Sequence, residues 1–255
     1  MKIVVLVKEV PDTYGERRLD TVTGLLDRAA SDPVIDEIDE RALEVALQYK
    51  DADKNTEVVV MTLGPDTAKD GLRKLLAMGA DRAVHIVDDG FVGSDALRTA
   101  QALAAALERA EFDLVLTGNE STDGRCGVVP AMVAELLGLP IVGNLSAVDI
   151  HDGSITGTRS TATATTTLRS PLPAVASVTE KSAEARFPSF KGTMTAKRKP
   201  LAIVGQADIG LAAPTATSAV LTVVERPARA AGEKIYDRGD AGAAIVAFLR
   251  ERKVV

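Results

Sequence analysis

Hydrophobic residues follow two alternating patterns over the first 140 positions of the chain. Short continuous runs of β-branched residues are typical of strands buried on both faces, and they predict strands at residues 2–8, 57–64, 82–88 and 112–120. Between them, apolar residues recur every three or four positions, which predicts helices at residues 32–51, 65–80, 93–111 and 127–140. Strands and helices that alternate over short connections predict an α/β fold with a doubly wound, mostly parallel sheet.

The ends of these helices carry local signals. The second predicted helix has Pro65 at its start and Gly79 near its end, as is common for helices. Ser94 is the expected N-cap of the third helix. The first helix opens with acidic residues at 36, 37, 39 and 40, which suit the positive end of the helix dipole. By default, such an acidic run is a solvent-exposed helix end.

After Pro140 the pattern becomes richer in strands. A β-hairpin is expected around Asp152-Gly153, followed by further β-branched segments at 161–170 and 172–179. A long irregular loop is expected at 184–200 and a helix at 240–253, with extended segments at 212–218 and 225–235. We therefore expect a nucleotide-binding α/β domain over 1–210, including its β-rich later part, and a C-terminal arm with a helix over 211–255.

Composition narrows the class of protein. The net charge of −6 argues against nucleic-acid binding, which favours a basic surface. No apolar run approaches the roughly 18 residues that a membrane-spanning helix needs, so the protein is not expected to be membrane-embedded. A single cysteine, Cys126, excludes an internal disulfide and fits a reducing compartment. These features predict a cytoplasmic protein.

The segment "TGNESTDGRCG", residues 117–127, is the strongest candidate for binding a ligand. It follows a predicted strand at the edge where open α/β sheets bind ligands. Its glycines, Gly118, Gly124 and Gly127, allow close approach and positive φ, and the next helix presents its amides to an anion. The segment matches neither of the common glycine-rich nucleotide motifs. A phosphate-binding loop and a glycine-rich turn that caps a helix therefore both remain open at this point.

Catalytic constellations are not evident in the sequence. No Ser/His/Asp triad, carboxylate pair or metal-ligand set is recognisable, and neither His85 nor His151 has a reason to pair with Cys126. His85 lies within a predicted strand and is expected to be structural. The chain is therefore expected to bind and carry rather than to catalyse.

Four motifs together resemble the β subunit of electron transfer flavoprotein over roughly residues 1–250. They are "KIVVLVKEVPDT", "AMGADRAVHI", "GNESTDG" and "LPAVASV…RFPSFKGTMTAKRKP". The resemblance implies a non-catalytic subunit of a heterodimer whose α subunit holds most of the FAD, while the β subunit binds a structural AMP. It also implies electron transfer from acyl-CoA and related dehydrogenases, as in fatty-acid oxidation, to a membrane quinone oxidoreductase.

The resemblance also implies site residues. Val10–Tyr14 and Ile38 would lie nearest the flavin. The positions that match the family's AMP contacts are Leu6, Asp36, Glu37, Ile38, Asp39, Leu63, Gly118, Asn119, Ser121, Thr122, Asp123, Gly124, Arg125, Cys126, Gly127, Val128 and Val129.

The segment 184–200 concentrates aromatic and basic residues in an acidic, aromatic-poor chain. Such a stretch is often a proline-stiffened surface loop with a solvated charge run. An apolar tip beside cations also suits docking onto another protein. The resemblance implies that this loop docks on dehydrogenases, with Phe190 as anchor. The partner-binding set is Phe187, Phe190, Met194 and Lys197, although the basic run 197–199 also suits packing between subunits.

Two departures from the family pattern affect these expectations. Thr166 stands where many relatives have a glutamate, so a gating role at that position is in doubt. The glycine loop carries Arg125 where many relatives have aspartate, is one residue shorter, and lacks the Asp-Gly-Asp-Thr run of relatives that bind a second FAD. This favours AMP. The alternative reading is a stand-alone ATP- or AMP-binding module, or an adenylate-forming enzyme of the same fold class.

Overall fold

The computed structural model describes residues 1–28, 30–151, 153–212, 218, 220–232, 234, 236–237 and 239–254. The chain divides into two compact units, Met1–Thr222 and Val223–Val255. The first contains every described strand, and the second contains helix α6 (Ala241–Glu251). The functional division expected after residue 210 stays a prediction. Most of the extended segment expected at 212–218, and residues 233 and 235 of the second, lie outside the described residues.

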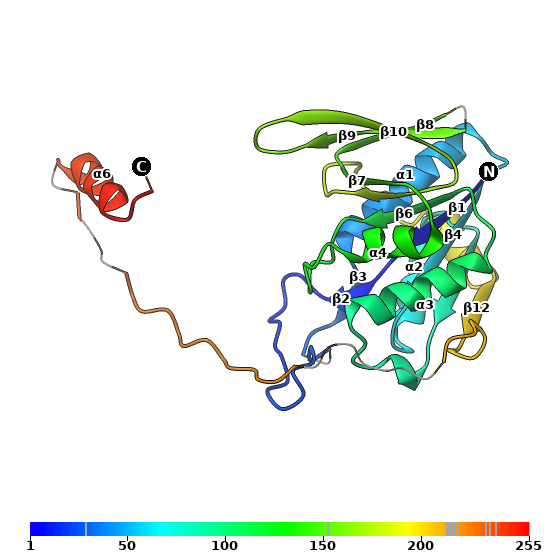
Figure 1. Ribbon diagram of the computed structural model, residues 1–255, viewed down its shortest axis with the longest axis horizontal. Helices are drawn as coiled ribbons and strands as arrows, with labels where there is room; N and C mark the ends of the chain where they lie inside the picture. Colours follow the sequence, from blue (N-terminus) through cyan, green and yellow to red (C-terminus); the bar gives the residue numbers. More distant parts are fainter. Residues whose placement is uncertain are drawn as a thin grey trace. The chain divides into compact units, whose positions relative to one another are not determined.

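A seven-stranded parallel sheet forms the centre of the first unit, in the order β12-β5-β4-β1-β6-β11-β7 (Figure 1). Along the chain, its strands are β1 (Lys2–Leu6), β4 (Glu57–Leu63), β5 (Arg82–Ile86), β6 (Leu114–Gly118), β7 (Ile141–Leu145), β11 (Ala174–Val178) and β12 (Leu201–Val204). Val4 and Val5 of β1 point to opposite faces, yet both are fully buried. This two-sided burial explains why the strand is continuously apolar rather than alternating.

Helices cover both faces of this sheet (Figure 1). On one face, α1 (Glu37–Ala52) and α2 (Ala68–Met78) pack through Leu43, Leu72 and their neighbours. On the other face, α3 (Ala96–Glu108) and α4 (Val129–Leu137) pack through Leu107 and Val133. A short 3-10 helix, η1 (Asp89–Phe91), follows β5. The expected doubly wound α/β fold is confirmed.

The helices of the sheet domain differ from the sequence prediction by a few residues at their ends, and two of these differences have a clear local cause. The first helix begins at residue 37, because Pro33–Ile35 forms a short strand, β3, that pairs with β2 (Glu9–Pro11). The N-cap of α3 is Asp95 rather than Ser94, since the Asp95 carboxylate accepts a hydrogen bond from the Arg98 amide at 2.8 Å. A carboxylate oxygen fills the capping role here, and Ser94 lies one position too early.

The expected hairpin is confirmed as part of a three-stranded antiparallel sheet. It consists of β8 (Ala147–His151), β9 (Ser154–Ser160) and β10 (Thr165–Pro171). Asp152, the first residue of the expected turn, lies outside the described residues. The later strands β7, β11 and β12 join the central sheet, so the β-rich part is divided between the central sheet and the antiparallel sheet.

The loop expected at 184–200 is not irregular throughout. It contains α5 (Phe190–Ala196), whose N-cap Ser189 accepts a hydrogen bond from the Gly192 amide at 2.9 Å. A Cβ at Gly192 would lie 2.0 Å from the carbonyl oxygen of Ala77, so glycine lets α5 lie directly on the end of α2.

Among the described residues, no helix combines the length and apolar character that crossing a bilayer requires.

Candidate functional site

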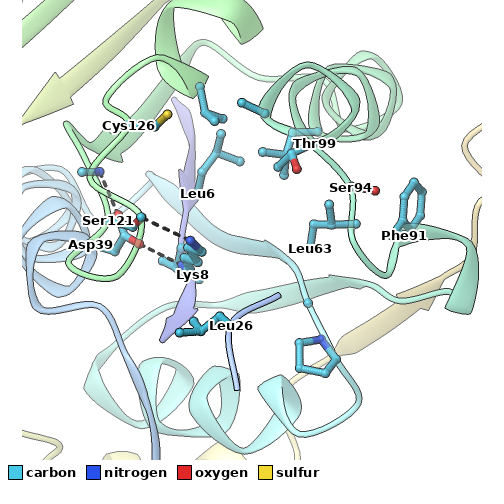
Figure 2. Close-up of a pocket in the computed structure, with 18 of the residues that line it drawn as sticks. Leu6, Lys8, Leu26, Asp39, Leu63, Phe91, Ser94, Thr99, Ser121 and Cys126 are labelled. Carbon is cyan, nitrogen blue, oxygen red and sulfur yellow. Dashed lines mark hydrogen bonds between the residues drawn. The ribbon is translucent and has the colours of Figure 1, made fainter. Parts of the chain in front are cut away.

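A cavity of about 670 Å³ lies at the carboxyl ends of β1, β4, β5 and β6 (Figure 2). The chain crosses from β1 to β4 on one side and later returns to β6 on the other, so the cavity lies at the switch point of the sheet. Lys8, Asp39 and Ser121 lie together on one side, while Phe91, Ser94 and Thr99 lie on the opposite side (Figure 2). Its volume is in the range of small-molecule sites.

The cavity brings together many of the residues expected at the nucleotide site. Those that line it are Leu6, Asp39, Leu63, Gly118, Asn119, Ser121, Gly124, Cys126, Gly127 and Val129. The expected residues that do not line it are Asp36, Glu37, Ile38, Thr122, Asp123, Arg125 and Val128. The residues that the resemblance implies for the AMP site therefore include some that line the cavity and some that do not.

Two of the acidic residues at the start of α1 fasten the glycine loop. Asp36 and Asp39 are buried, whereas Glu37 is exposed. Asp36 accepts hydrogen bonds from the amide and hydroxyl of Thr122, at 2.6 and 2.8 Å, and also from the amide of Ile38 at 3.0 Å. The default expectation of a solvated helix end is wrong for this pair, because the loop after β6 covers it.

Asp39 lies directly under the first glycine of the loop. Its two carboxylate oxygens accept hydrogen bonds from the amides of Gly118, at 2.9 Å, and Lys8, at 2.8 Å. Burial, together with the nearby charge of Asp36, raises the pKa of Asp39 well above its usual value, although both hydrogen bonds oppose this. A Cβ at Gly118 would come within 2.5 Å of an Asp39 oxygen, so the contact requires glycine.

Lys8 holds the loop from the end of β1. Its amine lies 2.7 Å from an Asp123 oxygen and 3.1 Å from the Ser121 hydroxyl. Burial alone would raise the pKa of Asp123, but the hydrogen bond and charge of Lys8, with Ser121 and Gly124, hold that pKa below its usual value. Lys8 is the last residue of the first predicted strand, 2–8, and this place at the carboxyl end of a strand is the sequence signal for a site residue.

The end of the loop, just before the start of α4, carries backbone amides that have no hydrogen-bond acceptor within the described chain. In the parts of the chain that the structure describes, the amides of Cys126, Gly127 and Val128 donate to no protein acceptor. Gly127 has a φ of +64° and Arg125 a φ of +50°. Gly118 and Gly124 do not have positive φ, so of the three loop glycines only Gly127 uses this freedom. This geometry suits an anion at the N-terminus of α4.

Other walls of the cavity were missed from sequence. Phe91 and Val92 come from the segment after β5, and Leu25 and Leu26 come from the chain between β2 and β3. The switch-point argument, applied to the strand at 82–88, would have indicated the first pair. The second pair had no sequence signal, because a long connection folds back over the sheet.

A buried Asn119 side-chain oxygen, Oδ1, has no hydrogen-bond partner among the described residues.

The segment around α5 exposes the residues expected to bind a partner. The exposed fractions of Phe187, Phe190 and Met194 are 91%, 86% and 66%, and Lys197 is also exposed. Phe190 and Met194 are four positions apart in α5 and so lie on one face of it. Lys199 differs, because its amine donates to the carbonyl oxygens of Leu76 and Ala80 within the chain.

The remaining candidate residues from the sequence have separate places in the structure. His85 is fully buried, and its Nε2 lies 3.2 Å from the carbonyl oxygen of Gly64, which confirms a structural place in β5. Thr166 is exposed on β10. Val10 is buried and Tyr14 is fully exposed, and their nearness to a flavin stays a prediction. Within the described ranges, no group of three or more His, Cys, Asp or Glu side chains is arranged to hold a metal.

Comparison with known proteins defines the class of this chain. The family model described as "Electron transfer flavoprotein domain" matches residues 23–209. That range includes the glycine loop, most of the central sheet and α5. The fold and cavity described above are thus those of an electron transfer flavoprotein subunit.

Individual relatives specify which subunit. The chain is 49% identical over 263 residues to the electron transfer flavoprotein subunit beta of Mycobacterium leprae, covering 99% of each chain. The identity is 48% to its counterpart in Mycobacterium tuberculosis H37Rv, with the same coverage. It is 33% over 266 residues to the caffeyl-CoA reductase-Etf complex subunit CarD of Acetobacterium woodii, covering 100% of both. The chain belongs to the electron transfer flavoprotein β-subunit family.

Proposed function

We propose that this chain binds AMP in the cavity at the carboxyl ends of the sheet. The observation that carries the proposal is the run of unpaired amides at 126–128, which leads into α4 beside the Ser121 hydroxyl. These groups would hold the phosphate. The apolar wall that includes Leu63 and Phe91 suits a purine ring, and the unpartnered Asn119 oxygen calls for a hydrogen-bond donor on the ligand.

We further propose that the chain functions in a heterodimer with an electron transfer flavoprotein α subunit that holds most of the FAD. When bound, FAD supplies the electron-accepting and electron-donating chemistry. Val10–Tyr14 and Ile38 of this chain would border it. The C-terminal arm, 211–255, packs on the α subunit in this proposal. Its helix α6 exposes Ile245, Val246 and Phe248 and has no buried residue, which supports a role against another chain.

The proposed electron path runs from acyl-CoA and related dehydrogenases, through the heterodimer, to a membrane quinone oxidoreductase. Phe187, Phe190, Met194 and Lys197 are the proposed docking residues for the dehydrogenases. Three large apolar side chains exposed within eight positions, beside an exposed cation, support this assignment. The aromatic side chains would anchor in a pocket of the partner, and the cation would steer the encounter.

Nucleotide analysis tests the cofactor proposal. The chain is co-produced with its α subunit, the complex is denatured, and the released nucleotides are identified by chromatography. One FAD and one AMP per complex are expected. Two FAD per complex would overturn the AMP assignment. ATP turnover by the isolated chain would instead favour an adenylate-forming enzyme.

Substitution of the apolar anchor tests the docking proposal. Phe190→Ala is expected to raise the KM of an acyl-CoA dehydrogenase for the complex while leaving FAD and AMP contents unchanged. Ile203→Ala is the matched control, because Ile203 is also exposed and apolar but lies on the edge strand β12. Equal electron-transfer rates in wild type and Phe190→Ala would contradict the docking role.

A further inference from the structure

The proposed docking segment is fastened to α1 through Arg186, the residue before Phe187. Its guanidinium makes a two-point contact with Glu44, with Nε 2.7 Å from one carboxylate oxygen and Nη2 2.9 Å from the other. The Arg186 amide also donates to Glu44, at 3.2 Å, and Nη2 contacts Asp51 at 2.9 Å. Backbone and side chain of Arg186 are thus fixed together at the start of the segment.

The Glu44 carboxylate is buried and depends on Arg186 for its charge compensation. Its side chain is only 6% exposed, and Arg186 is its hydrogen-bonding and ionic partner in the described chain. Removing one partner of such a pair leaves an uncompensated buried charge. The planar fork of arginine matches both carboxylate oxygens, and lysine lacks this geometry.

A second fastening holds the other end of the segment on α2. Arg73 donates to the carbonyl oxygens of Ala196 and Lys199, both at 2.9 Å. Lys199 in turn donates to the carbonyl oxygens of Leu76, at 2.8 Å, and Ala80, at 2.6 Å. The exposed residues Phe187, Phe190 and Met194 therefore lie between two anchored ends, one held by α1 and the other by α2.

We propose that Arg186 is a positioning residue for donor docking: through Glu44 and Asp51 it holds Phe187 and the entry to α5 in a preformed arrangement. The inference rests on the proposed docking function. Association must pay for ordering side chains and loops at an interface, and a segment ordered in advance lowers that cost. Arg186 points toward α1 and acts through the segment rather than by touching the donor.

Three variants of the α/β complex separate positioning from stability. Arg186→Gln removes the guanidinium and leaves the Glu44 carboxylate without its ionic partner. Arg186→Lys keeps the charge without the two-point contact. The double variant Arg186→Gln/Glu44→Gln removes the buried charge as well. The double variant is therefore expected to recover the thermal stability that Arg186→Gln loses, while the two-point ionic contact stays absent.

Electron transfer from a purified acyl-CoA dehydrogenase to the FAD of the complex provides the functional readout. All three variants are expected to raise the KM for the complex about tenfold, with kcat changed less than about twofold, because one or two interfacial side chains must then be ordered on docking. Amide hydrogen exchange in 187–196 is expected to accelerate. Lys54→Gln is the matched control, since Lys54 also pairs with Asp51 but does not touch Glu44.

The outcomes distinguish this inference from the proposed function. A raised KM in Phe190→Ala with an unchanged KM in Arg186→Gln would overturn the positioning role and keep the docking surface. An unchanged KM in both would overturn the docking surface itself, and the positioning role with it. Recovery of KM together with stability in the double variant would assign Arg186 to stability alone and also overturn the inference.

Discussion

The carboxylate of Asp36 accepts hydrogen bonds from both the amide and the hydroxyl of Thr122, at 2.6 and 2.8 Å. The two residues are 86 positions apart, and both are buried. Asp36 also caps α1 through the Ile38 amide. One side chain therefore starts the helix and holds the glycine loop that borders the nucleotide cavity.

Asp36→Ala is expected to lower the free energy of unfolding of the complex by about 2–4 kcal/mol, because it removes a helix cap and two hydrogen bonds to a charged acceptor. AMP content is expected to fall with it. Denaturant unfolding and nucleotide chromatography measure the two effects. Asp70→Asn is the control, since Asp70 is an exposed acid in the first turn of α2. An equal effect of both substitutions would contradict the fastening role.

Asp39→Asn is expected to change the pH dependence of stability. Because the pKa of Asp39 is raised in the folded state, that state binds more protons than the unfolded chain between the unfolded pKa, about 3.9, and the raised value. The contribution of Asp39 to the free energy of unfolding therefore falls as pH rises through this window. The neutral amide does not titrate.

The stability of wild type minus that of Asp39→Asn should thus decrease from about pH 4 upward. Urea unfolding of both proteins at a series of pH values measures this difference. A difference that grows with pH would mean that the carboxyl titrates below its usual range in the fold.

Gly118→Ala is expected to destabilise the complex by about 1–3 kcal/mol, because the new methyl group would overpack the contact with Asp39 and Ile38. Gly124→Ala provides the comparison within the same loop, since its Cβ would lie 3.5 Å from the nearest side-chain atom. Thermal unfolding of both variants measures the contrast. Similar melting temperatures for the two would refute the close approach at Gly118.

Lys199 and Lys197 are expected to respond differently to the same change. Lys199→Met should cost about 2 kcal/mol of stability, because two carbonyl oxygens at the end of α2 lose a charged donor. Lys197→Met should leave stability unchanged and slow donor association at low ionic strength, as expected for an exposed steering charge. Denaturant unfolding and stopped-flow reduction by the dehydrogenase measure these effects. A stability loss in Lys197→Met would assign that lysine to the fold.

Parts of the site were predictable because they follow directly from strand ends. Leu6, Leu63 and the loop 117–127 lie at or near the carboxyl ends of predicted strands, and the parallel sheet brings these ends to one edge. Leu25 and Leu26 were not predictable in this way, because they reach the cavity from a long connection. Whether Asp36 faces water or the loop depends on what covers α1, and the local sequence carries no signal for that cover.

The sequence by itself determined the α/β class, the central strands and the glycine loop, because periodicity, turn residues and capping act over a few positions. Its motifs also indicated the family that the comparisons confirm. Only the tertiary structure decided which strands neighbour β1 and which acids are buried. It also decided that 190–196 forms a helix held between Arg186 and Lys199. These features depend on contacts between residues far apart in the sequence, such as Glu44 with Arg186, 142 positions apart, which no local pattern encodes.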